Sequence, residues 1–121
     1  MNQITSYYLE KENNKDCILF YKNGFMYKTY EEDAILISYL LNTKLKHKNN
    51  SFYETTIQEF DIETLKTKFS ISFIIDNKCF NKKENNYYLL LAKANKKFRL
   101  DVIYHNLLEL IDTGDELEDF F

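Results

Sequence analysis

The chain has 121 residues, of which 45% are hydrophobic, and a formal net charge of −3. These values fit one compact domain with a sizeable core and exclude a disordered chain. The small net charge gives no overall attraction to polyanions, so only a local basic patch could bind nucleic acid. No stretch has the ~18 apolar residues of a membrane span, and the first residues lack the layout of a signal peptide. We therefore expect a cytoplasmic protein.

A strand, a tight turn and a second strand are expected after an N-terminal helical segment. Residues 18–21 form a short apolar run. Asn23-Gly24 is the strongest two-residue hairpin signal, because both residue types accept positive φ, and residues 25–30 supply the returning strand. The sequence thus predicts a β-hairpin with its turn at Asn23-Gly24.

A helix is predicted directly after this hairpin. Glu31, Glu32 and Asp33 place negative charge where the amides of a helix N-terminus are unpaired. The apolar residues that follow recur at helical spacing until about Asn42.

The middle of the chain divides into further elements at its asparagine-rich joints. They are a second hairpin or strand pair at residues 44–48 and 52–57, a helix at residues 62–69 and a buried strand at residues 71–75. Asp61 is the expected cap of that helix.

The last third contains an apolar run at residues 87–92, which periodicity alone does not assign and which we interpret as a strand. Residues 96–111 repeat apolar positions at helical spacing and predict the longest helix, ending near Gly114. Strands and helices therefore interleave, which indicates an α/β (α+β) fold with a mixed sheet flanked by helices. We expect one domain over residues 1–112 and an acidic tail over residues 113–121.

The cysteines and histidines give no catalytic or metal-binding pattern. Cys17 and Cys79 each lie in an apolar run, so both are interpreted as buried, reduced thiols. His47 and His105 form neither a metal cluster nor a triad with either cysteine. We therefore expect no metal, no cofactor and no enzymatic activity.

The order of pieces from residue 17 to residue 34 resembles the amino-terminal mismatch-recognition domain, domain I, of the MutS family of DNA mismatch repair proteins. An oily strand, a basic residue, a Gly turn, an aromatic strand and an acidic helix start follow one another. The matching residues are Leu19, Phe20, Tyr21, Lys22, Gly24, Tyr27, Tyr30, Asp33 and Ala34. The later elements keep the family's order to about residue 80. The resemblance implies a MutS domain I-like fold and contact with DNA.

The departures from the family pattern bear on function. The family's mismatch-reading Phe and Glu correspond here to Met26 and Lys28, and the Asp after its glycine corresponds to Phe25. Met26 could still act as an apolar wedge and Lys28 could contact a phosphate, but mismatch readout is not preserved. The chain also lacks the Gly-rich phosphate loop of a MutS ATPase, so a partner protein would have to supply catalysis.

Charge is unevenly distributed along the chain. Residues 1–43, 44–99 and 100–121 carry net charges of −2, +6 and −7. If the basic side chains meet on one surface, they would contact phosphates and make binding salt-dependent. The candidate nucleic-acid-binding residues are Lys22, Met26, Lys28, Lys44, Lys46, Lys48, Lys96, Lys97 and Arg99. The alternative is that these lysines only solvate the surface and protect an exposed strand edge.

Two functions therefore remain open. The first is a stand-alone accessory module that contacts the DNA backbone and shape without reading a mismatch. The second is a protein-interaction module on a MutS-like scaffold that no longer binds nucleic acid. The acidic tail is either a solvated end, a docking peptide through its last two phenylalanines, or a mask over the lysine-rich face.

Overall fold

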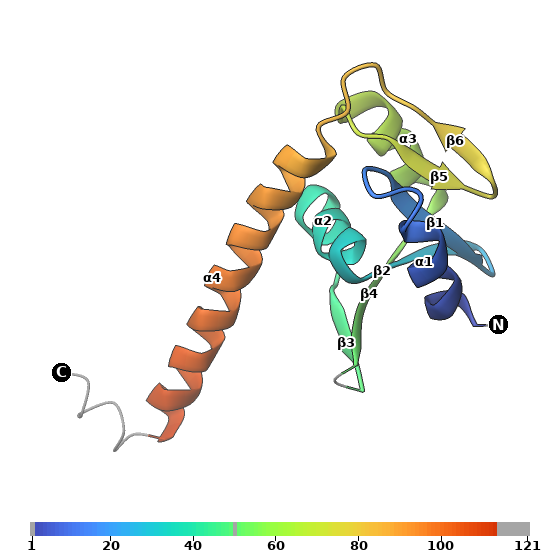
Figure 1. Cartoon of the computed structure of the whole chain (residues 1–121). Helices are drawn as coiled ribbons and strands as arrows, with labels where there is room; N and C mark the ends of the chain where they lie inside the picture. Colours follow the sequence, from blue (N-terminus) through green and yellow to red (C-terminus); the bar gives the residue numbers. More distant parts are fainter. Residues whose placement is uncertain (1, 50, 114–121) are drawn as a thin grey trace.

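The computed structural model describes residues 2–49 and 51–113. Its order is α1 (Gln3–Lys11), β1 (Ile18–Asn23), β2 (Met26–Tyr30), α2 (Glu31–Leu41), β3 (Lys46–Lys48), β4 (Phe52–Ile57), α3 (Glu59–Lys68), β5 (Phe73–Ile75), β6 (Lys78–Phe80) and α4 (Tyr87–Thr113). This arrangement confirms the predicted mixed sheet flanked by helices (Figure 1). None of the helices in the described ranges is long and apolar enough to cross a membrane.

The six strands form one sheet in the order β3-β4-β2-β1-β5-β6. Neighbouring strands are antiparallel except β1 and β5, which run parallel with Ile18 opposite Phe73. The long connection between β1 and β5 passes through β2, α2, β3, β4 and α3, and a parallel pair requires such a long connection. The β1–β2 and β3–β4 hairpins therefore form one half of the sheet, and β5–β6 forms the other half.

Each face of the sheet has its own apolar cluster, because side chains alternate along every strand. One face packs against α2, α3 and α4 through buried residues that include Ile18, Phe20, Ile57 and Phe73. The other face packs against α1, where a smaller cluster contains Tyr7, Leu19 and Tyr30. Helix α1 thus lies on the side of the sheet opposite to the other helices.

The prediction of a strand at residues 87–92 is wrong, because these residues form the first part of α4. Tyr87, Leu91 and Ala94 are buried at spacings of four and three, whereas Tyr88 and Leu89 between them are exposed. That burial pattern belongs to a helix with one face on the protein body. Residues 96–111 are helical, as predicted, within a longer helix of 27 residues that extends away from the sheet (Figure 1).

Two shorter elements also differ from the prediction. Strand β6 was not predicted, and it follows β5 through Asp76 and Asn77, whose φ values of 50° and 62° suit a type I′ hairpin. Helix α3 begins at Glu59 rather than after Asp61. The Asp61 carboxylate accepts a hydrogen bond of 2.8 Å from the backbone N–H of Gln58, so Asp61 closes a capping box from the third helical position.

The boundaries of α2 agree with the sequence analysis. All three acidic residues lie in its first turn, and Asn42 ends it with a φ of 57° in the left-handed region. The expected end of the last helix near Gly114 and the expected tail at residues 113–121 lie at or outside the limit of the described residues. The one-domain boundary at residue 112 stays a prediction.

Candidate nucleic-acid interface

The β1–β2 hairpin presents two apolar side chains at its tip. Asn23 pairs with Met26, so the turn consists of Gly24 and Phe25, one residue later than predicted. Gly24 alone of these two has a positive φ, at 67°, which matches a type II′ turn with glycine at its first central position. Phe25 is 99% exposed and Met26 is 41% exposed. The tip is therefore an exposed aromatic and thioether pair at the end of a two-stranded ribbon.

Three of the predicted lysines share one face of the sheet. Lys46 pairs with Glu54 and Lys48 pairs with Phe52, so both lysines point to the face of the sheet that carries Glu54. Lys28 points to the same face, because Tyr30, two residues later on β2, pairs with Glu54. We call Lys28, Lys46 and Lys48 the lysine cluster.

Glu54 lies in the centre of the lysine cluster and is only 4% exposed. Its Oε1 atom is 3.8 Å from the Nζ atom of Lys28 and 3.6 Å from that of Lys48. A buried carboxylate with two ammonium groups around it holds both side chains in place and cancels one of the three positive charges. The cluster keeps a formal charge of +2.

Lys22 and Lys44 do not belong to the lysine cluster. Lys22 pairs with Tyr27, and both side chains therefore point to the opposite face of the hairpin. Lys44 precedes β3, and its backbone oxygen accepts a hydrogen bond of 2.9 Å from the Thr55 hydroxyl. The alternation of residues 44, 46 and 48 predicted a shared face for all three, but the strand begins only at Lys46.

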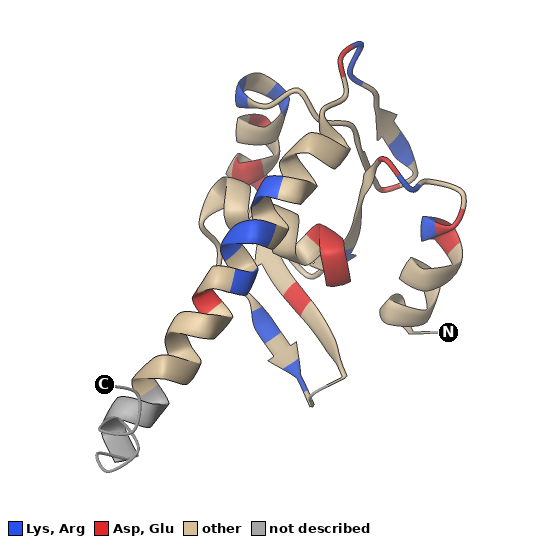
Figure 2. Ribbon diagram, turned by 60° about the vertical axis from the view of Figure 1, so that its left-hand side comes forward, with Lys and Arg blue, Asp and Glu red and all other residues tan. Residues whose placement is uncertain are grey.

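The basic residues of α4 lie across the β3–β4 ribbon from the cluster. Phe98 of α4 packs edge-on against Tyr53 at 5.2 Å between ring centroids, and Tyr53 pairs with His47 on the face that Lys46 and Lys48 avoid. Lys97 lines a cavity of about 310 Å³ with these aromatic rings. Lys96 and Arg99 are exposed on the same helix. The expected single basic surface is therefore split between the sheet and α4, and Figure 2 shows Lys and Arg spread over several elements.

The sequence analysis missed two residues of this site. Phe25 stands where the family pattern has an Asp, a residue type that favours turns. A side chain in a two-residue turn points into solvent, so the correct turn register would have identified Phe25 as exposed. Glu54 was missed because a lone acid in a predicted strand gives no sign of the lysines around it. Its pairing with Lys46 depends on the register of β3 against β4.

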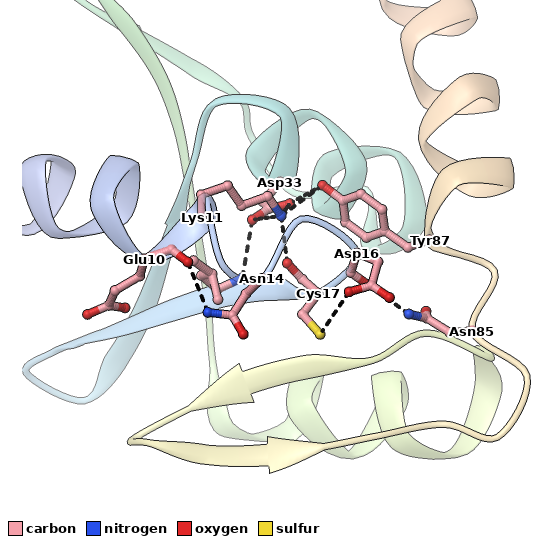
Figure 3. A network of polar contacts seen from close by, with 9 residues as sticks. Glu10, Lys11, Asn14, Asp16, Cys17, Asp33, Asn85 and Tyr87 are labelled. Atoms are coloured by element: carbon pink, nitrogen blue, oxygen red, sulfur yellow. Dashed lines mark hydrogen bonds and ion pairs between the residues drawn. The ribbon is translucent and has the colours of Figure 1, made fainter.

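A buried ion pair fixes α1 against the rest of the fold (Figure 3). The Lys11 ammonium donates to both Asp33 oxygens at 2.9 and 3.0 Å and to the Cys17 carbonyl at 2.6 Å. Asp33 also accepts from the Tyr87 hydroxyl at 2.5 Å and from the Leu19 N–H at 3.2 Å. Burial raises the pKa of the Asp33 carboxyl, and the Lys11 ammonium and the Tyr87 hydroxyl oppose that rise. Asp33 therefore joins α1, β1, α2 and α4, beyond its expected place at a helix N-terminus.

A cavity of about 560 Å³ lies between α1 and the first residues of α2 and α4. Its lining residues are Tyr7, Tyr8, Lys11, Glu12, Lys15, Glu31, Glu32 and Tyr88. In the part of the chain that the structure describes, no three His, Cys, Asp or Glu side chains could hold a metal ion.

Cys17 is buried as predicted, but Cys79 is exposed, because the short edge strand β6 leaves it uncovered.

A comparison with known proteins finds a family match that covers the β1–β2 hairpin and most of the sheet. The protein family described as MutS domain I matches residues 2–75 of the chain. The match includes α1 through β5, with both hairpins of the candidate interface, and ends before β6 and α4. No curated protein matches the chain.

Proposed function

Since the chain belongs to the MutS domain I family, we propose that it is a stand-alone accessory module that binds DNA through its backbone and shape. Domain I of this family is a DNA-mismatch-recognition type of domain. In this chain, Met26 and Lys28 stand in place of the reading Phe and Glu, so the module recognises no particular mismatch. It has no ATPase or other catalytic function of its own, and a partner protein supplies catalysis.

The observations that support this proposal best are the exposed apolar tip of the β1–β2 hairpin and the lysine cluster on one face of the same sheet. As a wedge in the minor groove, the exposed Phe25 and Met26 side chains unstack a base step and kink the duplex toward its major groove. The ammonium groups of the lysine cluster, on one face of the sheet, contact phosphates of the same duplex. Lys22 reaches the backbone from the other side of the hairpin.

Binding is tested by titrating labelled matched duplex, mismatched duplex, single-stranded DNA and structured RNA at two salt concentrations. We expect the two duplexes to bind equally and more tightly than the single strand. Replacing Lys46 and Lys48 with alanine is expected to lower the slope of log affinity against log salt by about 2, one for each lost phosphate contact. The matched control is Lys68→Ala with Lys83→Ala, two exposed lysines outside the cluster. The proposal fails if no nucleic acid binds even at low salt.

The tip and Glu54 give two sharper variants. Phe25→Ala is expected to weaken duplex binding by ~1–3 kcal/mol while leaving the salt slope unchanged, because it removes base contact and no charge.

Glu54→Gln is expected to strengthen binding at low salt, since it frees Lys28 and Lys48 from their carboxylate. A Glu54→Gln variant with weaker DNA binding would show that the cluster does not contact phosphate.

The second candidate function is a protein-interaction module on the same scaffold. The pairing of Glu54 with Lys28 and Lys48 favours it, because paired lysines attract phosphate less strongly than free ones. A partner segment with its own acidic and apolar side chains would fit the tip and cluster equally well. The absence of nucleic-acid binding in the titrations above would support this second function.

A further inference from the structure

We propose that the cavity between α1, α2 and α4 binds an organic cation, namely a guanidinium or alkylammonium group on a short aliphatic chain. The cavity has a volume of about 560 Å³, which is within the range of pockets that hold small molecules. Its walls combine three carboxylates with three tyrosines. Carboxylates and the faces of aromatic rings are the protein groups that attract such cations.

The carboxylates of the cavity come from two helices. Glu12 follows the last residue of α1, and Glu31 and Glu32 lie in the first turn of α2. Two hydrogen bonds of 2.9 Å hold the Glu31 carboxylate in place, one from the Tyr8 hydroxyl and one from the backbone N–H of Tyr53. Glu12 and Glu32 are exposed, and neither forms an ion pair with another residue that the structure describes. Both can therefore pair with a positively charged ligand.

Two lysines also line the cavity, but they do not balance its carboxylates. The Lys11 ammonium is already paired with the buried Asp33 (Figure 3). Among the lining residues, Lys15 therefore opposes three carboxylates. The N-termini of α2 and α4 and the C-terminus of α1 border the cavity, and their partial charges of about half a unit each cancel in part. The excess of negative charge favours a cation over an anion such as phosphate.

The tyrosines supply the aromatic part of the walls. Tyr8 of α1 and Tyr88 of α4 are 48% and 61% exposed. Tyr7 is 2% exposed, and its hydroxyl is a buried group without a hydrogen-bond partner among the described residues. Buried hydroxyls rarely lack a partner, and this one can accept a hydrogen bond from the N–H of an ammonium or guanidinium group. The fold already holds one ammonium over a ring beside the cavity, since Lys11 Nζ lies 4.5 Å from the centroid of Tyr87.

The environment of Glu32 fits the same ligand. Partial burial and the Asp33 charge raise the pKa of the Glu32 carboxyl, and the Lys11 ammonium opposes the rise. A further positive charge in the cavity would also oppose it and stabilise the carboxylate.

This inference does not depend on DNA binding. No residue that lines the cavity belongs to the hairpin tip or to the lysine cluster. The cavity also needs Tyr88 of α4, which lies outside residues 2–75 that match the domain I family.

Binding is measured on the 121-residue chain, without nucleic acid, by calorimetry and by two-dimensional NMR of the amide groups. The probes are spermidine, the blocked peptide acetyl-Gly-Arg-Gly-amide and Mg²⁺, all at constant ionic strength. We expect at least one of the organic cations to bind at a single site, more tightly than Mg²⁺, with the largest NMR shifts at Tyr8, Glu12, Glu32 and Tyr88. Tighter binding of spermidine would identify a free polyamine as the ligand class, and tighter binding of the peptide would identify an arginine side chain of a partner protein. No binding of either, shifts outside the cavity, or equally tight binding of Mg²⁺ overturns the proposal.

Removal of the carboxylates tests the site directly. Glu12→Gln with Glu32→Gln should weaken binding about tenfold, because it removes two charges that each contribute as an exposed ion pair does. The matched control is Glu63→Gln with Glu84→Gln, the same charge change at two exposed glutamates outside the cavity. Circular dichroism should be unchanged in both variants. Equal affinity of the two double variants would contradict the assignment.

Two further variants distinguish a cation from an anion. Lys15→Gln should strengthen binding of the organic cation about twofold, because it removes a competing positive charge. Tyr88→Ala should weaken binding about two- to fivefold through the loss of an exposed cation–π contact. Weaker binding by the Lys15→Gln variant would indicate an anion site and overturn the proposal.

Discussion

At the scale of single residues, Asp33 has the largest set of buried polar contacts described above. Replacing it with asparagine leaves the Lys11 ammonium buried without a counter-charge. We expect Asp33→Asn to lower the free energy of unfolding by about 3–5 kcal/mol. Urea unfolding followed by circular dichroism measures this loss. The matched control is Asp101→Asn, which breaks an exposed pair with Lys97 of 3.1 Å and should cost no more than about 0.5 kcal/mol.

A double substitution separates the ion pair from simple loss of packing. Lys11→Met with Asp33→Leu removes both charges and keeps apolar volume, so it should destabilise the protein less than the sum of the two single changes. If the two single losses simply add, the contact between Lys11 and Asp33 contributes no coupling. That result would assign the loss to packing around Tyr87 instead.

The two cysteines should react at very different rates. Burial raises the pKa of the Cys17 thiol to about 11, with the Asp16 carboxylate adding to the rise, whereas Cys79 is exposed. The thiolate is the reactive form, so an alkylating reagent at neutral pH should modify Cys79 quickly and Cys17 only in denaturant. Mass spectrometry of the alkylated protein counts the modified thiols. Cys79→Ser should leave the native protein unreactive, and rapid labelling of that variant would contradict the buried position of Cys17.

At the scale of elements, local signals predicted most of the fold. The β1–β2 and β3–β4 hairpins, the start of α2 and its end at Asn42 followed from turn residues and from acidic residues at a helix N-terminus, whereas the β5–β6 hairpin was not predicted. The segment at residues 87–92 could not be assigned in this way, because an unbroken apolar run has no period that separates a buried strand from a helix. In the structure the run packs on the body through Tyr87, Leu91 and Ala94, and this spacing of four and three residues is that of a helix.

The candidate site was harder to predict than the fold. Alternation correctly predicted that Lys46 and Lys48 lie on one face of the sheet. Sequence alone does not determine whether Lys22 lies on that face or on the opposite one. That choice depends on the turn register, and a shift of one residue reverses the face of every side chain beyond it. The same shift separates the predicted turn at Asn23-Gly24 from the observed turn at Gly24 and Phe25. Pairing across distant strands therefore decides which basic residues meet.

The β1–β2 hairpin gives a prediction about its turn. Gly24 has a φ of 67°, and an added Cβ atom would meet no atom within 4 Å. Gly24→Ala should therefore cost about 1 kcal/mol through left-handed backbone strain alone. Gly24→Asn should cost less, because asparagine tolerates positive φ better. Thermal unfolding measures both variants, and equal stability of Gly24→Ala and the wild-type protein would show that the turn changes conformation freely.

At the scale of the whole molecule, tyrosines join elements that are distant in sequence. Tyr21 donates to Glu10 on α1 at 2.6 Å, Tyr30 donates to Gln3 at 2.8 Å, and Tyr87 donates to Asp33. Burial is the largest cause of the raised pKa of each of these phenols, and for Tyr30 it acts with the Glu54 charge to give a value of about 12. The same groups that hold α1 and α4 on the sheet thus resist ionisation.

This property predicts instability at alkaline pH. An unfolded tyrosine loses its proton near pH 10, whereas the buried tyrosines keep theirs, so the unfolded state binds fewer protons above that value. The stability that these phenols contribute is therefore complete below pH 10 and is lost as the pH rises toward 12. Phenolate absorbance after a pH jump should show a fast phase from exposed tyrosines and a slow phase that coincides with loss of circular dichroism. Tyr87→Phe should reduce the slow phase and leave the fast one unchanged. Ionisation of all ten tyrosines in one fast phase, with the fold intact, would contradict the buried network.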